Sequence, residues 1–149
     1  MKLIKVKTGK TFDETNDLLN DLRESSDLSN KIMFDRVFDS IQHIGFIDDD
    51  NMLSLFCSSS DFNFKRLSVL FTNLSIDFSC VDLTNKVLLS DNIKTSYLDE
   101  EGVDMTDEIN KFINDFYLNN VTLDIILDKI NIKGVSSIND IDKSILESI

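Results

Sequence analysis

The sequence predicts an α+β protein in which a small sheet of roughly three to four strands packs with helices and a mostly helical C-terminal third follows. Two observations predict this class. Alternating polar and apolar stretches, typical of half-buried strands, occur in the first 98 residues, and apolar residues at helical spacing recur along the chain. We therefore expect an α+β domain over residues 1–98 and an acidic helical segment or appendage over residues 99–149, which can pack on the same core.

The first elements expected are a short strand and two helices. Lysines alternate with apolar residues over 2–7, which indicates the strand. The first helix begins at Thr11, because Glu14 stands three residues further on and can complete a capping box. The second begins near Ser29 and is expected to end with Gly45 at its C′ position.

Residues 52–82 predict a β-α-β unit. Met52–Cys57 is an apolar run expected to form a buried strand, and residues 58–61 offer N-caps for an amphipathic helix. Residues 75–82 then alternate strictly, as a half-buried strand does. Connections between parallel strands are right-handed in nearly all proteins, so we expect a right-handed crossover here.

Two further turns and a linker are expected. The run Asp48-Asp49-Asp50-Asn51 predicts a turn before the β-α-β unit. Residues 84–86 are expected to turn the chain into a strand over 87–89, which would form a hairpin with the strand before it. The weak polar signal over 90–104 indicates a loop or linker.

Three helices are predicted in the C-terminal third. One begins at about Thr106, a second is capped by Thr122 and ended by Gly134, and a third is capped by Asn139. Asp142 stands at the third position of the last helix, where a carboxylate is favourable to the free amides.

The charge is acidic and unevenly distributed. The formal net charge is −12, of which residues 1–98 carry −4 and residues 99–149 carry −8. An acidic balance argues against direct binding to nucleic acid or to an anionic membrane, since both require Lys and Arg. We expect another protein as the partner, one with a basic surface among the options, and self-association as a further option.

The sequence lacks residues that familiar catalytic and metal-binding motifs require. A phosphate loop around Gly9-Lys10-Thr11 would need glycine at position 4, where Ile4 stands. His43 is the only histidine, and with two cysteines it makes no four-ligand zinc set. The acidic run 48–50 lacks the spacing of a calcium loop. The sequence therefore predicts no enzyme, no cofactor and no metal.

Cys57 and Cys80 are the only cysteines, and the chain shows neither a signal peptide nor a long apolar run. Both observations predict free, buried thiols and a cytoplasmic location, either host cytoplasm or a virion if the protein is a phage component. Cys57 is expected to end a strand just before a helix, a position that lowers a thiol pKa. The outline is similar to half of a glutaredoxin-like fold, but Ser60 replaces the second cysteine of C-x-x-C and the chain has no proline.

The C-terminal residues carry a family resemblance. Ile125-Ile126-Leu127-Asp128-Lys129-Ile130, followed by Lys133-Gly134-Val135-Ser136-Ser137-Ile138, resembles a short helical hairpin appended to the C-termini of diverse bacterial and phage proteins. In that appendage the pattern I-L-D-K-I-x-x-K-G-x-x-S-L precedes a capped acidic helix. The resemblance covers residues 122–149 and implies a docking or packing module without catalysis.

The sequence thus favours a non-enzymatic protein-interaction or assembly component, of phage or mobile-element origin. The contact surface is expected on the helical third, with these candidate residues: Phe112, Phe116, Tyr117, Asp124, Ile126 and Asp128. One alternative is an acidic inhibitor that mimics nucleic acid, of the anti-restriction or anti-CRISPR type, which requires a contiguous acidic face. A second alternative is a small thioredoxin-like redox protein that uses Cys57.

Overall fold

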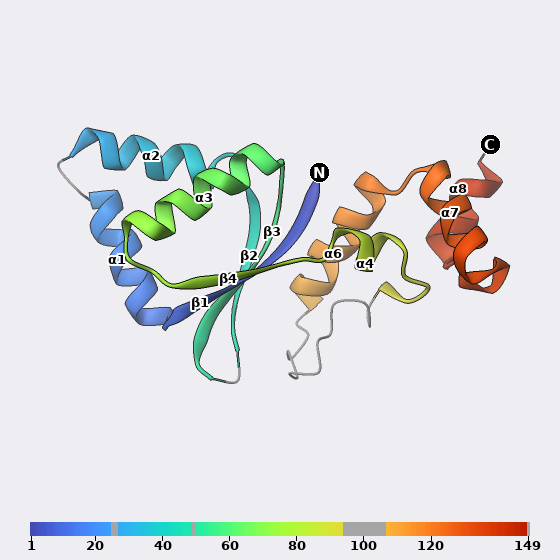
Figure 1. Ribbon diagram of the computed structural model, residues 1–149, viewed down its shortest axis with the longest axis horizontal. Coiled ribbons are helices and arrows are strands. Elements are labelled where there is room, and N and C mark those ends of the chain that lie inside the picture. Colours follow the sequence, from blue (N-terminus) through green and yellow to red (C-terminus); the bar gives the residue numbers. More distant parts are fainter. Residues whose placement is uncertain (25–26, 49, 94–106, 149) are drawn as a thin grey trace. The chain divides into compact units, whose positions relative to one another are not determined.

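The computed structural model describes residues 1–24, 27–48, 50–93 and 107–148 (Figure 1). They form two compact units, unit 1 (Met1–Asp82) and unit 2 (Leu83–Ile149). Unit 1 holds a four-stranded sheet and unit 2 is helical in its described part, which confirms the predicted α+β class with a helical C-terminal region. The division at Leu83 differs from the predicted boundary at residue 99.

Unit 1 contains, in chain order, β1 (Lys2–Thr11), α1 (Phe12–Glu24), α2 (Leu28–Phe38), β2 (Gln42–Ile47), β3 (Met52–Ser59), α3 (Asp61–Asn73) and β4 (Phe78–Asp82). The strand order is β2-β3-β1-β4, and every neighbouring pair is antiparallel. Strands β3 and β4 therefore run parallel to each other with β1 between them. The predicted β-α-β unit is present in the split form found in ferredoxin-like topologies.

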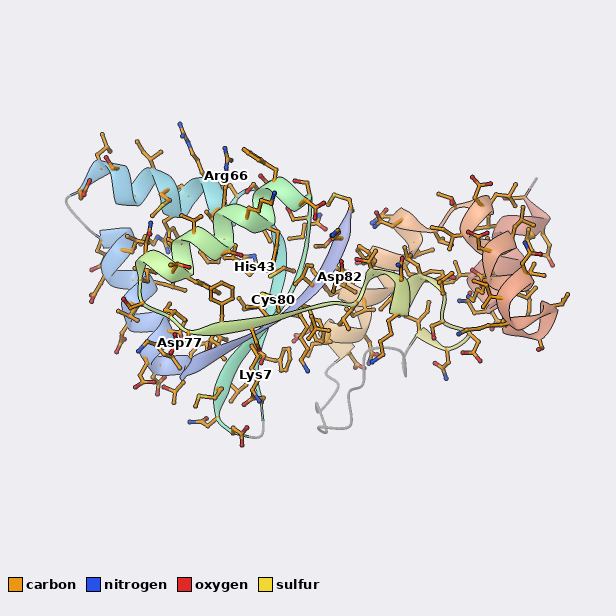
Figure 2. All side chains as sticks on the ribbon, in the orientation of Figure 1. Lys7, His43, Arg66, Asp77, Cys80 and Asp82 are labelled. Carbon is orange, nitrogen blue, oxygen red and sulfur yellow. The ribbon has the colours of Figure 1, made fainter. Side chains whose placement is uncertain are left out.

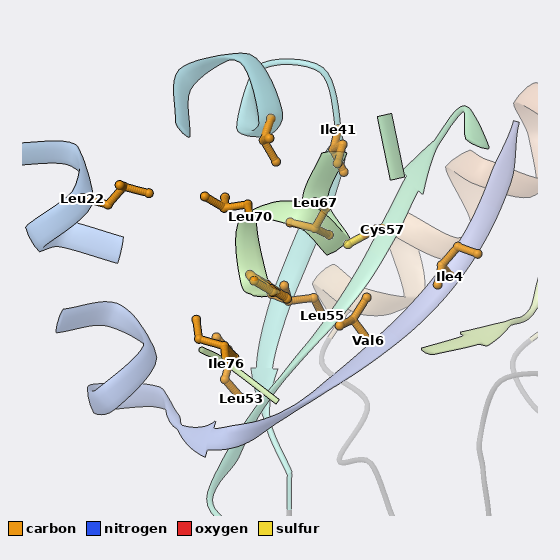
Figure 3. Close-up of a cluster of buried hydrophobic side chains, with 12 residues drawn as sticks. Ile4, Val6, Leu22, Ile41, Leu53, Leu55, Cys57, Leu67, Leu70 and Ile76 are labelled. Atoms are coloured by element: carbon orange, nitrogen blue, oxygen red, sulfur yellow. The ribbon is translucent and has the colours of Figure 1, made fainter. Parts of the chain in front are cut away.

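One face of the sheet forms the core of unit 1 with the three helices. Ile4 and Val6 of β1 lie opposite Cys57 and Leu55 of β3, so these four side chains share a face. They belong to one cluster of buried apolar residues (Figure 3). The helices and connections add Leu22, Val37, Ile41, Leu67, Leu70, Phe71 and Ile76.

The local helix signals of unit 1 are present. The Glu14 amide donates to Thr11 Oγ1 at 3.3 Å, and the Thr11 amide donates to the Glu14 carboxylate at 3.0 Å, which confirms the capping box. The amide bond from Thr11 also lowers the pKa of Glu14. Ser60 caps α3 by accepting from the Asn63 amide at 3.3 Å.

The helix predicted from Ser29 to Gly45 is wrong in its second half. Helix α2 ends at Phe38, and Gln42–Ile47 is strand β2. Gly45 pairs with Leu55, and a Cβ on Gly45 would lie 3.3 Å from the Leu55 side chain. Pairing with β3 decides the conformation here, because a short apolar segment carries no strong local preference.

The acidic run after β2 forms the β2–β3 hairpin turn in its described residues. Asp48 Oδ1 accepts from the amides of Asp50 and Met52, and Asn51 adopts a positive φ of 61°. Asp49 lies outside the described residues.

Strand β4 is shorter than predicted. It begins at Phe78, and the predicted start at Ser75 is a connection in which Ser75 has a φ of 54°. Ile76 is buried. Cys80 is exposed, although it lies opposite Val6 and therefore on the same face of the sheet as the core. Because β4 is an edge strand that pairs with β1 alone, its alternation does not produce a buried stripe.

Unit 2 contains α4 (Thr84–Leu88), α6 (Asp107–Asn120), α7 (Leu123–Lys133), a 3₁₀ turn η1 (Val135–Ser137) and α8 (Asp140–Glu147). The hairpin predicted over residues 84–89 is wrong, since α4 buries Val87 and Leu88 on a helical face. The three C-terminal helices are confirmed, with Thr122 and Asn139 as N-caps. Most of the predicted linker, residues 94–104, lies outside the described residues.

Candidate functional site

An open groove of about 350 Å³ lies between α2 and α3 of unit 1, and we call it the α2–α3 groove. Its apolar lining consists of Ile32, Met33, Val37, Phe62 and Val69, with Ser29 at one side. Three cationic side chains, Arg36, Lys65 and Arg66, complete the lining, which includes no carboxylate. The α2–α3 groove is therefore apolar and lined with basic side chains, although the net charge of the chain is −12.

The groove forms because α3 carries apolar residues on two faces. Leu67, Leu70 and Phe71 point into the core, whereas Phe62 and Val69 stand on the outer face. Phe62 is 62% exposed and Val69 53% exposed. Apolar side chains gathered at a surface depression mark interaction sites more often than scattered ones do.

The basic residues of the groove are held close to its apolar lining. The Arg66 guanidinium lies 4.3 Å from the centre of the Phe62 ring, on the outer side of α3 (Figure 2). This cation–π contact keeps the charge beside the ring without neutralising it. No carboxylate in the described part of the chain forms an ion pair with Arg36, Lys65 or Arg66. The groove thus offers three positive charges that have no ionic partner among the described residues.

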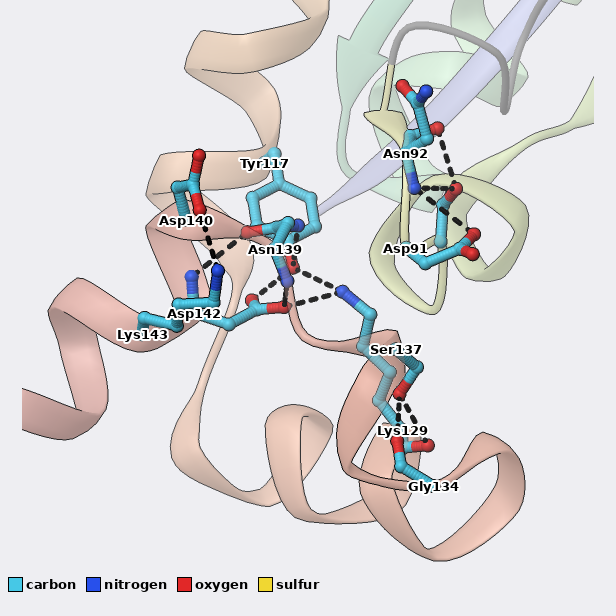
Figure 4. Close-up of polar contacts among 11 residues, drawn as sticks. Asp91, Asn92, Tyr117, Lys129, Gly134, Ser137, Asn139, Asp140, Asp142 and Lys143 are labelled. Atoms are coloured by element: carbon cyan, nitrogen blue, oxygen red, sulfur yellow. Dashed lines mark hydrogen bonds and ion pairs between the residues drawn. The ribbon is translucent and has the colours of Figure 1, made fainter.

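Unit 2 contains a second unusual feature, a buried polar network (Figure 4). Lys129 and Asp142 are both fully buried, and the Lys129 Nζ lies 2.6 Å from Asp142 Oδ2. Lys129 also donates to the Tyr117 hydroxyl at 3.1 Å, and that hydroxyl donates to Asp142. Burial, together with the bond to Asp142, raises the pKa of Tyr117. The network joins one side chain from each of α6, α7 and α8.

The same network includes the cap of α8. The Asp142 amide donates to the Asn139 side chain at 2.9 Å, and the Asn139 amide returns a bond to Asp142 Oδ2 at 3.0 Å. Asn139 Nδ2 also donates to the Tyr117 hydroxyl at 3.1 Å. Asp142 is therefore a capping residue and the counterion of Lys129 at once. Each buried side-chain nitrogen and oxygen of the network has at least one hydrogen-bond partner, so the network orients the three helices.

The turn between α7 and α8 completes this arrangement. Gly134 has a φ of +87°, a conformation that other residues rarely adopt. Ser137 donates to the carbonyl oxygens of Gly134 and Lys129, at 2.6 and 3.3 Å. Four polar residues of the C-terminal pattern, Lys129, Ser137, Asn139 and Asp142, are thus linked by hydrogen bonds around the turn between α7 and α8.

Three of the candidate partner-binding residues are not at the surface. Phe116 is 3% exposed, and Tyr117 and Ile126 are fully buried. The expectation that these three anchor a partner is wrong, because a buried side chain holds the fold and is not available for binding. Phe116 and Tyr117 lie on the buried face of α6, and Ile126 lies on the buried face of α7.

The remaining candidates lie where a partner can reach them. Asp124 and Asp128 are exposed on α7, one turn apart, and Phe112 is half-buried on α6. Beside the two carboxylates stand Leu123 and Leu127, also one turn apart and 39% and 45% exposed. The sequence prediction did not include these leucines, although their spacing matches that of the two aspartates.

Cys57 does not have the position that the redox hypothesis requires. It lies within β3, two residues before the strand ends, and is 1% exposed. Burial raises the pKa of its thiol to about 12, whereas the redox hypothesis requires a lowered pKa. Cys80 is also a free thiol, and β1 separates its strand from that of Cys57.

The remaining candidates for chemistry are His43 and a metal site. His43 lies in β2 with its ring edge against Phe38, and its Nδ1 is 3.2 Å from the Ile41 carbonyl oxygen. No group of three or more His, Cys, Asp or Glu side chains is placed to hold a metal ion among these residues. None of the described helices combines the length and apolarity needed to cross a membrane.

Several exposed acids are paired with lysines. Lys2 contacts Asp61 and Asp82 at 3.1 and 3.3 Å, and Lys7 contacts Asp48 at 3.3 Å. The nucleic-acid-mimic hypothesis predicts an acidic face free of bases, and these pairs count against such a face at the two ends of β1.

No family model matches the chain, and no curated protein or solved structure matches it either. The resemblance of residues 122–149 to a helical appendage stays a prediction from the sequence pattern. Two surfaces of the chain expose apolar side chains beside charged ones, the α2–α3 groove and the exposed side of α7.

Proposed function

We propose that this protein is a non-enzymatic protein-interaction component that binds an amphipathic helix with acidic flanks in its α2–α3 groove. The observation that carries the proposal is the groove itself, which combines an exposed apolar lining with Arg36, Lys65 and Arg66. Helix-in-groove recognition places an apolar helix face on such a lining and charged flanks against its walls.

The apolar lining and the three cations of the groove contribute to binding in different ways. Burying Phe62, Ile32 and Val69 supplies affinity in proportion to the apolar area removed from water, about 25 cal/mol per Å². The three cations select the sign of the partner's charge and accelerate association. Because these charges are exposed to solvent, their contribution is screened by salt. Binding should therefore weaken with salt without disappearing.

Two synthetic peptides of about 18 residues test the proposal, a length that permits a helix to form. Both carry the same leucine stripe, one with Glu on each flank and the other with Lys. We expect the Glu peptide to bind and to shift the NMR methyl signals of Ile32, Met33 and Val69. The Lys peptide should bind at least about tenfold more weakly, a difference of about 1.4 kcal/mol.

Two matched variants locate the site. R36E/R66E reverses two groove charges and should abolish binding of the Glu peptide. K10E/R23E makes the same change in net charge on residues outside the groove lining and should leave binding nearly unchanged. Equal binding of both peptides, or equal losses in both variants, would contradict the proposed site.

A further inference from the structure

The α7 surface of unit 2 has the chemistry that the groove requires. Leu123 and Leu127 form an exposed apolar pair one turn apart, and Asp124 and Asp128 lie next to them with the same spacing. Neither aspartate forms an ion pair with a described residue. We call these four side chains the α7 face.

We propose that a second copy of this chain supplies the helix, so that the α7 face of one copy lies in the α2–α3 groove of another. The inference rests on the function proposed above and names the partner. Charge complementarity is its main argument. Three cations line the groove and two carboxylates flank the exposed leucines of α7, and none of these five groups forms an ion pair with a described residue.

The lengths of α7 and of the groove agree with the proposal that α7 of a second copy occupies the groove. Helix α7 has eleven residues and is therefore about 16 Å long, and α2, one wall of the groove, also has eleven residues. The α7 backbone is held firmly before binding, because its inner face carries Ile126 and Lys129, both fully buried. A helix already fixed in its bound conformation avoids the entropy cost of folding on contact.

The contact joins two different surfaces, so each copy keeps one free groove and one free α7 face. Such a heterologous contact produces rings when its rotation closes and open chains when it does not. Burial in a single helix groove is at the low end for specific interfaces, so association should be weak and should increase with concentration.

The experiment is sedimentation velocity of the full chain at rising concentration, up to about 500 μM, in low salt. The wild type should form larger species as concentration rises. R36E/R66E, which changes the groove, and D124K/D128K, which changes the α7 face, should each stay monomeric. D13K/D17K makes the same charge change as D124K/D128K on the exposed side of α1 and should associate like the wild type.

The quadruple variant R36E/R66E/D124K/D128K gives the decisive result. It keeps the net charge of −12, exchanges the signs of the two surfaces and should regain self-association. It should not co-assemble with the wild type, since both mixed contacts place like charges together. Circular dichroism of every variant checks that the helices are retained.

Three results would overturn the inference. A wild type that stays monomeric while the Glu peptide binds its groove excludes the second copy but leaves the proposed function standing. Self-association that both double variants retain places the interface elsewhere on the chain. A monomeric wild type that binds neither peptide overturns the inference and the proposed function together.

Discussion

The main buried clusters of the two units differ in chemistry. The core of unit 1 is an apolar cluster in which sheet residues such as Leu55 meet helix residues such as Leu70. Unit 2 also has apolar interior residues, among them Ile113, but it buries the Lys129 ammonium and the Asp142 carboxylate beside them. Apolar contacts are non-directional and each contributes by its area, whereas a buried ion pair depends on the presence of both partners.

This difference predicts different responses to mutation. In unit 1, removing one side chain leaves a cavity whose cost depends on how far the neighbours relax. In unit 2, removing one charge leaves the other buried without a counterion, which is costly wherever it occurs. A second change that removes the remaining charge should restore stability in unit 2, and no equivalent second change exists in unit 1.

The largest effect is expected at the ion pair. Asp142→Ala should lower the free energy of unfolding of unit 2 by about 3–5 kcal/mol, because Lys129 is left buried and unpaired. The double variant K129M/D142L replaces both charges with apolar groups and should be clearly more stable than D142A. Chemical denaturation followed by far-UV circular dichroism measures both. A double variant no more stable than D142A would mean that the pair is not the critical contact.

A core truncation in unit 1 provides the comparison. Leu70→Ala should cost about 2–5 kcal/mol, since Leu70 is fully buried in the apolar cluster. Its neighbour Val69 is 53% exposed, and Val69→Ala should change stability by less than about 0.5 kcal/mol. Hydrogen exchange of the β1 and β3 amides reports on this unit. Similar losses in the two variants would contradict the described orientation of α3.

Features decided by local chemistry could be predicted from the sequence. The capping residues Thr11, Ser60 and Asn139 lie within three residues of the amides they accept from. The amphipathic stripes of α3 and α6 also follow from helical spacing alone. Such signals are legible because both partners are close together in the chain.

Features decided by distant residues could not be predicted. The sequence predicts the end of a helix where β2 lies, because the pairing of β2 with β3 is a tertiary contact that the local pattern does not show. Lys129 follows Asp128 in the sequence, as a lysine on an exposed helix face commonly does. The local sequence does not show that Lys129 is buried against a carboxylate thirteen residues away. The α2–α3 groove depends on Phe62 and Val69, which lie outside the buried apolar face of α3.

The helix caps extend the comparison with smaller effects. Ser60→Ala in unit 1 removes one bond to the Asn63 amide and should cost about 1 kcal/mol. Asn139→Ala in unit 2 removes a cap and the bond to Tyr117 as well, and should cost about 2 kcal/mol. The denaturant midpoints of the two variants give the ratio of the two losses in stability. Equal losses would show that the Asn139–Tyr117 bond contributes little.

Alkaline pH gives the smallest and most selective test. Burial holds the pKa of Tyr117 above its unfolded value of about 10, so the neutral hydroxyl is the form that the folded state favours. Its contribution is fully present below about pH 10 and is lost as pH rises towards the folded pKa, because only the unfolded state releases the proton in that window. Between pH 10 and pH 11 the stability of unit 2 should fall by about 1 kcal/mol. Lysines also titrate there, so Tyr117→Phe is the control, and the difference between the two pH profiles isolates the tyrosine. Parallel profiles would mean that Tyr117 ionises as easily in the folded unit as in the unfolded chain, and that the network does not hold its proton.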